Sequence, residues 1–237
     1  MDTSTRTTID AALRERPSPP LFLLIVFFLL WLWLALAPVS REDWLLENLL
    51  VFAAVPALVA THRALQFSHG AYICLFAFLA LHTIGAHYTY SLVPYDRWWE
   101  GLTGASLSEV FRFERNHYDR AIHFLYGALI LPAAVELFEA YAKPHGLWRA
   151  VLPAMFVMSH SVIYEVIEWL AASIVAPELG DAYVGAQGDH WDAQKDMALA
   201  AAGALCMTAL FRIDAFARLF QSTAPCAAGA TGQCERA

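Results

Sequence analysis

The stretch LFLLIVFFLLWLWLALAPV, residues 21–39, contains no charged side chain and decides the class of protein. An α-helix rises about 1.5 Å per residue, so a run of this length approaches the roughly 30 Å hydrocarbon core of a bilayer. We therefore interpret residues 21–39 as a transmembrane helix. The composition agrees, because 59% of the 237 residues are hydrophobic and only 16% are charged. This balance is typical of a polytopic membrane protein.

Five further apolar segments are long enough to cross a bilayer as helices. They are residues 44–60, 67–87, 118–141, 147–174 and 190–211. The sequence thus predicts an all-α polytopic membrane protein with a bundle of about six transmembrane helices. Pro56, Pro132 and Pro153 fall within these spans, where neighbouring helices can satisfy the carbonyls that proline leaves free.

The segments divide the chain into one domain and two polar ends. We expect residues 20–219 to form the six-helix domain, and residues 1–19 and 220–237 to be a disordered leader and tail. The leader precedes an apolar run that is long enough to span, which is unlike a cleavable signal peptide. A net charge of -7 without a long basic run argues against a nucleic-acid partner. The partners expected are membrane lipids and a lipid or small-molecule substrate.

The distribution of Lys and Arg over the loops orients the predicted bundle. Most loop cations fall on the side that holds both termini, and the positive-inside rule assigns that side to the cytoplasm. The segment 175–189 on the opposite side has no Lys or Arg. Both termini are therefore expected in the cytoplasm, with the long segment 88–117 outside.

In this topology the dense polar motifs gather at the external ends of four predicted helices. The residues are His82, His87, His117, Asp119, His123, His160, Glu165, Glu168, Asp189, Asp192 and Asp196. Asp119 and His123 are four residues apart, so they share one helix face. Ionisable groups at membrane depth are costly and usually face the bundle interior or a wet cavity. One polar His/Asp/Glu pocket is the expected result.

Carboxylates crowded in such a pocket need cations or protons to balance them. Carboxylate and imidazole ligands together suit Zn, Mn or Fe, and oxygen ligands alone suit Mg or Ca. Two residues, Glu168 and Asp196, are the candidate catalytic carboxylates. The candidate metal ligands are His87, His117, Asp119, His123, Asp189 and Asp192.

A purely structural interpretation stands beside the metal site. The aspartates can pair with Arg120 and Lys195, or can begin helices where negative charge meets the positive end of the helix dipole. Asp189 in particular follows Gly188 and precedes a predicted helix, which favours a capping role.

The motifs GAHYTY, HYDRAIHF, YEVIEW and QGDHWDAQKDM resemble the YjdF family of bacterial inner-membrane proteins, with matches between about residues 85 and 200. More distantly, Asp119-Arg120, His123, Glu168 and the stretch from Asp192 to Asp196 are similar to the polar signature of VanZ-like membrane proteins. There the residue after the aspartate is usually Lys, whereas this chain has Arg120. The resemblance implies a multi-pass inner-membrane protein, but neither family implies a particular reaction.

Three functions remain open at this point. The first is a metal-dependent membrane enzyme acting on a lipid or envelope metabolite. The second is a proton- or ion-coupled transporter, and the third is a non-catalytic scaffold or accessory subunit.

Overall fold

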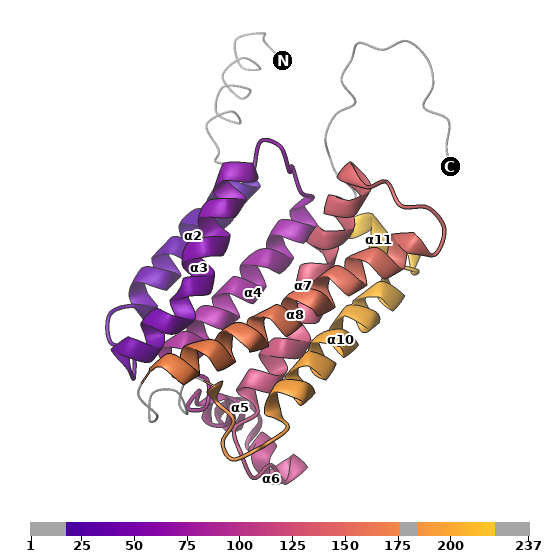
Figure 1. Ribbon diagram of the computed structural model, residues 1–237. Coiled ribbons are helices and arrows are strands. Elements are labelled where there is room, and N and C mark those ends of the chain that lie inside the picture. Colours follow the sequence, from indigo (N-terminus) through magenta and orange to yellow (C-terminus); the bar gives the residue numbers. More distant parts are fainter. Residues whose placement is uncertain (1–17, 176–183, 221–237) are drawn as a thin grey trace, which may run out of the picture.

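The computed structural model describes residues 18–175 and 184–220, and the described chain is helical without any β-strand (Figure 1). Six long helices form a bundle, which confirms the predicted all-α class. They are α2 (Pro19–Leu34), α3 (Arg41–Thr61), α4 (His69–His87), α7 (Tyr118–Tyr141), α8 (Trp148–Ile174) and α10 (Asp192–Leu210). Nearly all of the predicted leader and tail lies outside the described residues.

Four of these helices are long and apolar enough to cross a membrane, namely α3, α4, α7 and α8. The helix α2 is apolar but shorter. The helix α10 has the length, but Asp192, Lys195 and Asp196 make its first turns polar. The bundle is thus apolar along most of its length and polar where α10 begins.

The junction between α2 and α3 differs from the sequence prediction, which continued the first helix to Val39. The α2 helix ends at Leu34, where His87 Nδ1–H donates to the Leu34 carbonyl at 2.7 Å and Arg41 donates to the Ala35 carbonyl at 2.8 Å. These side chains satisfy carbonyls that a longer helix would have bonded internally. The α3 helix then begins at Arg41, because the Ser40 hydroxyl accepts the backbone N–H of Asp43 as an N-cap.

The helix α7 lies at the centre of the bundle and packs against α4, α8 and α10. Its contact with α10 depends on two glycines that let the backbones approach closely. A Cβ atom at Gly127 would lie 1.9 Å from the Ala200 carbonyl oxygen, and one at Gly203 would lie 2.0 Å from the Phe124 carbonyl oxygen. Small residues commonly form such contacts between membrane helices. The two glycines therefore set the depth and rotation of α10 against α7.

Short helices mark the two ends of the bundle (Figure 1). The helices α5 (Tyr95–Thr103) and α6 (Leu107–Phe111) lie at the end where α7 and α10 begin. The short helix α11 (Asp214–Ala217) and the 3-10 helix η1 (Arg218–Phe220) lie at the other end, where Leu219 approaches Gly70 at the start of α4. The polar motifs belong to the α5/α6 end.

Candidate functional site

Buried carboxylates from three neighbouring helices converge at the α5/α6 end of the bundle. Asp119 and His123 come from the start of α7, Glu165 and Glu168 from the last turns of α8, and Asp196 from the start of α10. We call these five residues the acid cluster. His123, Glu168 and Asp196 are 8%, 9% and 2% exposed, so the cluster lies inside the protein. The convergence follows from the antiparallel packing of α7 with α8, because the end of one lies beside the start of the other.

Three members of the acid cluster have the geometry of a metal site. One ligand atom each from Asp119, His123 and Asp196 lies within 4.8 Å of the other two. His123 Nε2 is 3.5 Å from Asp119 Oδ1 and 3.6 Å from Glu165 Oε1. Ligands bonded at about 2.0–2.2 Å to one metal ion lie roughly 3–4 Å apart, and the 3.5 Å between His123 and Asp119 is in this range. We call Asp119, His123 and Asp196 the triad.

Several oxygens around the triad have no hydrogen-bond donor in the described part of the chain. Asp196 Oδ1 and Glu165 Oε1 are both buried in this state. Glu165 and Glu168 are three residues apart on α8, so they share one helix face. Buried polar atoms are normally hydrogen-bonded, so the two unpaired acceptors are unusual.

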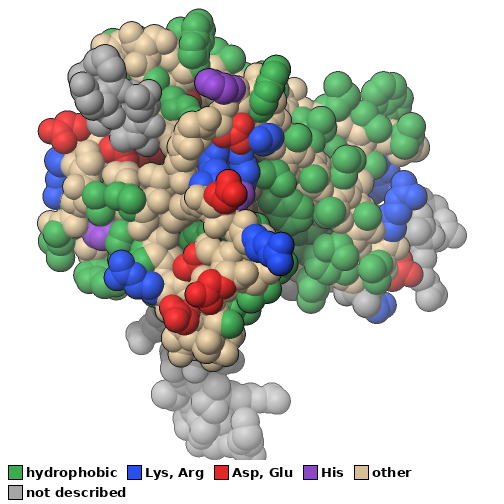
Figure 2. All heavy atoms as spheres, turned by 90° about the horizontal axis from the view of Figure 1, so that it is seen from below, with side chains coloured by type: hydrophobic (Ala, Val, Ile, Leu, Met, Phe, Trp, Pro, Cys, Tyr) green, Lys and Arg blue, Asp and Glu red, His purple; other side chains and the backbone are tan. Residues whose placement is uncertain are grey.

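Basic residues form a separate ion-pair group on the outer side of the cluster. Arg115 donates to Asp192 Oδ1 at 2.8 Å, and Arg120 donates to Asp189. Lys195 Nζ is 2.5 Å from Asp189 Oδ2. We call Arg115, Arg120, Asp189, Asp192 and Lys195 the ion-pair group. Figure 2 views this end of the bundle and shows Lys, Arg, Asp and Glu side chains together near the middle of the face, beside a large hydrophobic area.

Two groups outside the membrane-spanning helices have shifted pKa values in this region. The Lys195 ammonium, and the Trp191 backbone N–H that donates to Asp189, hold the pKa of the Asp189 carboxyl well below its usual range. Burial, followed by the positive charges of Arg120 and Arg115, lowers the pKa of the His117 imidazole below its ordinary range. The first shift keeps the Asp189 carboxylate ionised for its ion pairs, and the second favours a neutral His117 imidazole beside Arg120.

The structure brings together some predicted site residues and separates others. Asp119, His123, Glu168 and Asp196 are in the acid cluster. Asp189 and Asp192 belong to the ion-pair group, in the charge-balancing role that the structural interpretation describes.

Two predicted ligands, His87 and His117, lie apart from the acid cluster. His87 bonds the Leu34 carbonyl at the end of α2. His117 precedes the first turn of α7, with its ring centroid 4.2 Å from that of Phe113 and its Nδ1 3.5 Å from Arg120. Neither His87 nor His117 is grouped with the triad.

Sequence reasoning missed three residues beside the cluster. Asp43 and Glu47 on α3 are 0% and 3% exposed, and Glu47 Oε2 accepts the Tyr164 hydroxyl at 3.3 Å. The sequence prediction began this helix at Trp44 and so left Asp43 outside it, although the i, i+4 spacing of the two acids on one helix face was the available signal. Arg115 lies in a segment with acidic neighbours, and nothing in the sequence distinguishes it.

A cavity of about 210 Å³ adjoins the acid cluster. Asp119 and His123 lie at its polar side, together with Ser161 and Tyr164 from α8. The remaining lining is mainly apolar and comes from α3, α4, α7 and α8. A cavity beside convergent polar groups is the usual form of a binding site.

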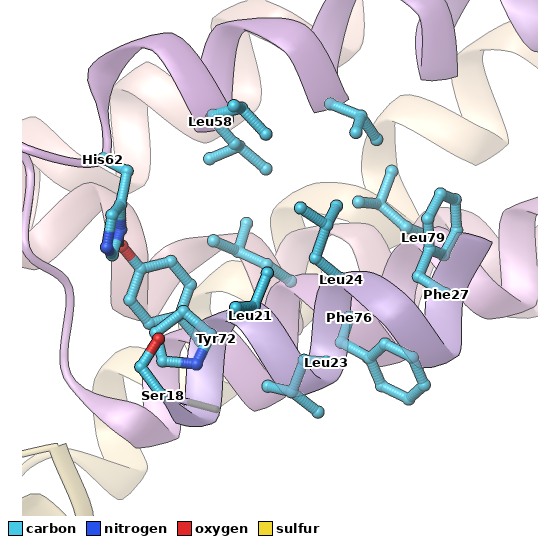
Figure 3. A pocket seen from close by; sticks show the side chains of 14 residues that line it. Ser18, Leu21, Leu23, Leu24, Phe27, Leu58, His62, Tyr72, Phe76 and Leu79 are labelled. Carbon is cyan, nitrogen blue, oxygen red and sulfur yellow. Dashed lines mark hydrogen bonds between the residues drawn. The ribbon is translucent and has the colours of Figure 1, made fainter. Parts of the chain in front are cut away.

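A second cavity, of about 340 Å³, lies between α2, α3 and α4 at the opposite end of the bundle. Figure 3 shows Leu21, Leu24 and Phe27 of α2 facing Leu58 and Leu79, with His62 and Tyr72 at one side. His62 Nδ1 and the Tyr72 hydroxyl are bonded to each other at 2.7 Å. Its lining is mainly apolar and contains no carboxylate, in contrast to the cavity beside the acid cluster.

Comparisons with known proteins agree with a membrane location. The chain is 32% identical to the inner membrane protein YjdF of Escherichia coli (strain K12) over 194 residues, which are 80% of this chain and 88% of that protein. No solved structure matches the chain. Together with the membrane-length helices, this relative supports a multi-pass inner-membrane location. Residues 19–215 match the family described as "Predicted membrane protein (DUF2238)", and the chain belongs to that family.

Proposed function

We propose that this protein is a divalent-metal-dependent membrane enzyme whose metal ion is held by Asp119, His123 and Asp196. The observation that carries the proposal is the triad itself, in which two carboxylates and one imidazole from two packed helices lie within 4.8 Å of one another. The proposed donor set of two oxygens and one nitrogen suits Zn, Mn or Fe. Glu165 would complete the site, because its Oε1 is buried, lacks a hydrogen-bond donor among the described residues and lies 3.6 Å from His123 Nε2.

Charge balance supports a cation at the triad. In the described ion pairs, the nearby arginines and lysine contact Asp189 and Asp192, whereas the acid-cluster carboxylates are contacted by the His123 imidazole, which is charged only when protonated. A histidine that binds a metal is neutral, so His123 would then offer no positive charge to the four carboxylates of the cluster. A buried ionised carboxylate without a partner is strongly unfavourable. A divalent ion would offset two of these charges and use the unpaired oxygens as ligands.

The arrangement of the remaining groups supports catalysis rather than metal storage. The 210 Å³ cavity has Asp119 and His123 in its wall, so a substrate held there would meet the metal ligands. A bound divalent ion would act as a Lewis acid on a carbonyl or phosphoryl oxygen. Glu168 would serve as the proton acceptor, since it is adjacent to Glu165 and is not in the triad. The substrate class expected at this depth is a lipid or an envelope metabolite.

Metal content of the purified protein tests the proposal. We expect the full chain in detergent, stripped with a chelator and reloaded separately with Mn, Zn or Fe(II), to bind about one ion per chain. Asp196→Asn and His123→Gln should reduce binding at least tenfold, because each removes one of the three ligands. The matched controls are Asp214→Asn and His145→Gln, which alter an exposed aspartate at the start of α11 and an exposed histidine between α7 and α8.

The proposal is overturned if the wild type binds none of the three metals, or if the triad variants bind them as tightly as the controls do. Unfolding temperatures of all four variants should be measured alongside. A folded triad variant that has lost its metal separates loss of a ligand from loss of structure.

A further inference from the structure

The cavity beside the triad reaches the lipid-facing side of α8. Ile163 and Ile167 line the cavity and are nevertheless 52% and 49% exposed. Ile163 lies eleven residues before the end of α8 at Ile174, which corresponds to about 16 Å along the helix axis. This depth is near the middle of a hydrocarbon core of about 30 Å. The cavity therefore opens sideways toward lipid tails.

The neighbouring surface of α8, a helix long and apolar enough to cross a membrane, is apolar around this opening. Val162, Val166 and Leu170 are 46–47% exposed and are all apolar. A water-soluble molecule would have to cross hydrocarbon to enter here, whereas a lipid tail is already present at this depth.

The interior of the cavity has both apolar and polar walls. Ile122 and Phe78 are buried and line it, and so do Asp119 and His123 of the triad. Ser161 also lines it, is 2% exposed, and its hydroxyl has no hydrogen-bond partner within residues 18–175 and 184–220. By contrast, Ser159 and Ser173 on the same helix donate to the carbonyls four residues earlier, both at 2.7 Å. A buried hydroxyl without a partner at a cavity wall indicates a polar group of a ligand.

We infer that the substrate is a bilayer lipid, which enters between Ile163 and Ile167, places its hydrocarbon chain against Ile122 and Phe78, and presents its polar group to Ser161 and the triad. This inference rests on the proposed metal site and names its substrate class. At about 210 Å³ the cavity is smaller than typical small-molecule pockets of roughly 300–1,000 Å³. Only part of one acyl chain would enter the cavity, while the rest of the lipid would stay in the bilayer.

Photo-crosslinking tests the inference. The full chain is reconstituted in vesicles of phosphatidylethanolamine and phosphatidylglycerol that contain a trace of phosphatidylethanolamine with a diazirine in one acyl chain. After irradiation, labelled residues are mapped by mass spectrometry. Lipid surrounding the protein labels exposed residues such as Leu205, whereas labelling of the buried Phe78 and Ile122 requires a chain inside the cavity. We expect both buried residues to be labelled.

A matched pair of variants shows whether the acyl chain enters between Ile163 and Ile167. Ile163→Trp puts a larger side chain into the opening, and Val166→Trp makes the same type of change on an exposed position of α8 that does not line the cavity. We expect Ile163→Trp to lower labelling of Phe78 and Ile122 at least fivefold and Val166→Trp to leave it unchanged. Absent labelling of both buried residues in the wild type, or labelling that Ile163→Trp does not lower, overturns the lipid assignment.

Metal content of the same samples keeps this inference distinct from the proposed function. Wild-type protein that is labelled at Phe78 and Ile122 but binds no metal would retain the lipid site and remove the metal enzyme. Protein that binds metal through the triad but is never labelled at these residues would retain the metal site and remove the lipid. Asp196→Asn should lose the metal and keep the labelling.

Discussion

At the scale of single residues, two aspartates one turn apart on α10 have different environments. Asp192 Oδ1 accepts from Arg115 at 2.8 Å and lies 3.3 Å from Arg120, whereas Asp196 takes part in no Lys or Arg ion pair in the described ranges. Asp192 Oδ2 and Asp196 Oδ1 both lack a hydrogen-bond donor within those ranges. Both side chains are buried. The first therefore balances two arginines, while the second remains available to bind a cation.

Asp192→Asn should destabilise the protein without removing its metal. The substitution keeps the shape of the side chain but leaves two partly buried guanidinium groups with less compensating charge, which costs on the order of 3 kcal/mol. Thermal unfolding in detergent should show a clear decrease in the unfolding temperature, with Asp214→Asn as the exposed control. Metal content should stay close to that of the wild type. An unchanged unfolding temperature together with lost metal would instead place Asp192 among the ligands.

At the scale of helices, the site depends on how closely α7 and α10 approach each other. The triad draws two ligands from α7 and one from α10, so a shift between these helices separates Asp196 from Asp119 and His123. Gly127 and Gly203 permit the close approach, and in both cases a backbone carbonyl of the other helix occupies the space of a Cβ atom. Backbone atoms cannot rotate away as a flexible side chain can.

Gly127→Ala should weaken both the fold and the metal site. An added methyl group 1.9 Å from the Ala200 oxygen forces the helices apart, and overpacking of this kind typically costs about 1–3 kcal/mol. We expect a lower unfolding temperature and weaker metal binding than in the wild type. Gly101→Ala is the control, because a Cβ atom there meets nothing within 4 Å. If both variants behave alike, close packing of α7 and α10 does not hold the site together.

At the scale of the whole molecule, the bundle has a polar and an apolar end. The acid cluster and the ion-pair group lie at the end that carries α5 and α6, while the chain enters α2 and leaves η1 at the other end (Figure 1). If the positive-inside assignment holds, the termini are cytoplasmic and the candidate site opens toward the external leaflet.

Fusions to full-length or near full-length chains test this orientation. Alkaline phosphatase inserted at Gly104, in the exposed turn after α5, should be active, since the enzyme folds only outside the cytoplasm. The same enzyme fused after Arg218 should be inactive, and green fluorescent protein at that position should be fluorescent. The reverse pattern would place the acid cluster on the cytoplasmic side.

The sequence by itself determined that the chain is a bundle of long helices. Each membrane-spanning helix can be predicted from its own residues alone. A bilayer requires all backbone groups to be hydrogen-bonded within the helix, so the length of an apolar segment indicates whether it can span. The helix over residues 118–141 was predicted with the boundaries that the structure has. The i, i+4 pair Asp119 and His123 was also readable, since both residues lie on one face of one helix.

Only the tertiary structure decided which groups from other helices join that pair. The rotation and depth of a helix depend on its packing partners, so the sequence could not distinguish Asp192 from Asp196. Nor could it show that Arg115, in the loop before α7, reaches Asp192 on α10. Glu47 likewise comes near the cluster through packing between helices, because its Oε2 accepts the Tyr164 hydroxyl of α8. Local spacing fixes neighbours within a helix, whereas the glycine contacts between α7 and α10 fix neighbours across helices.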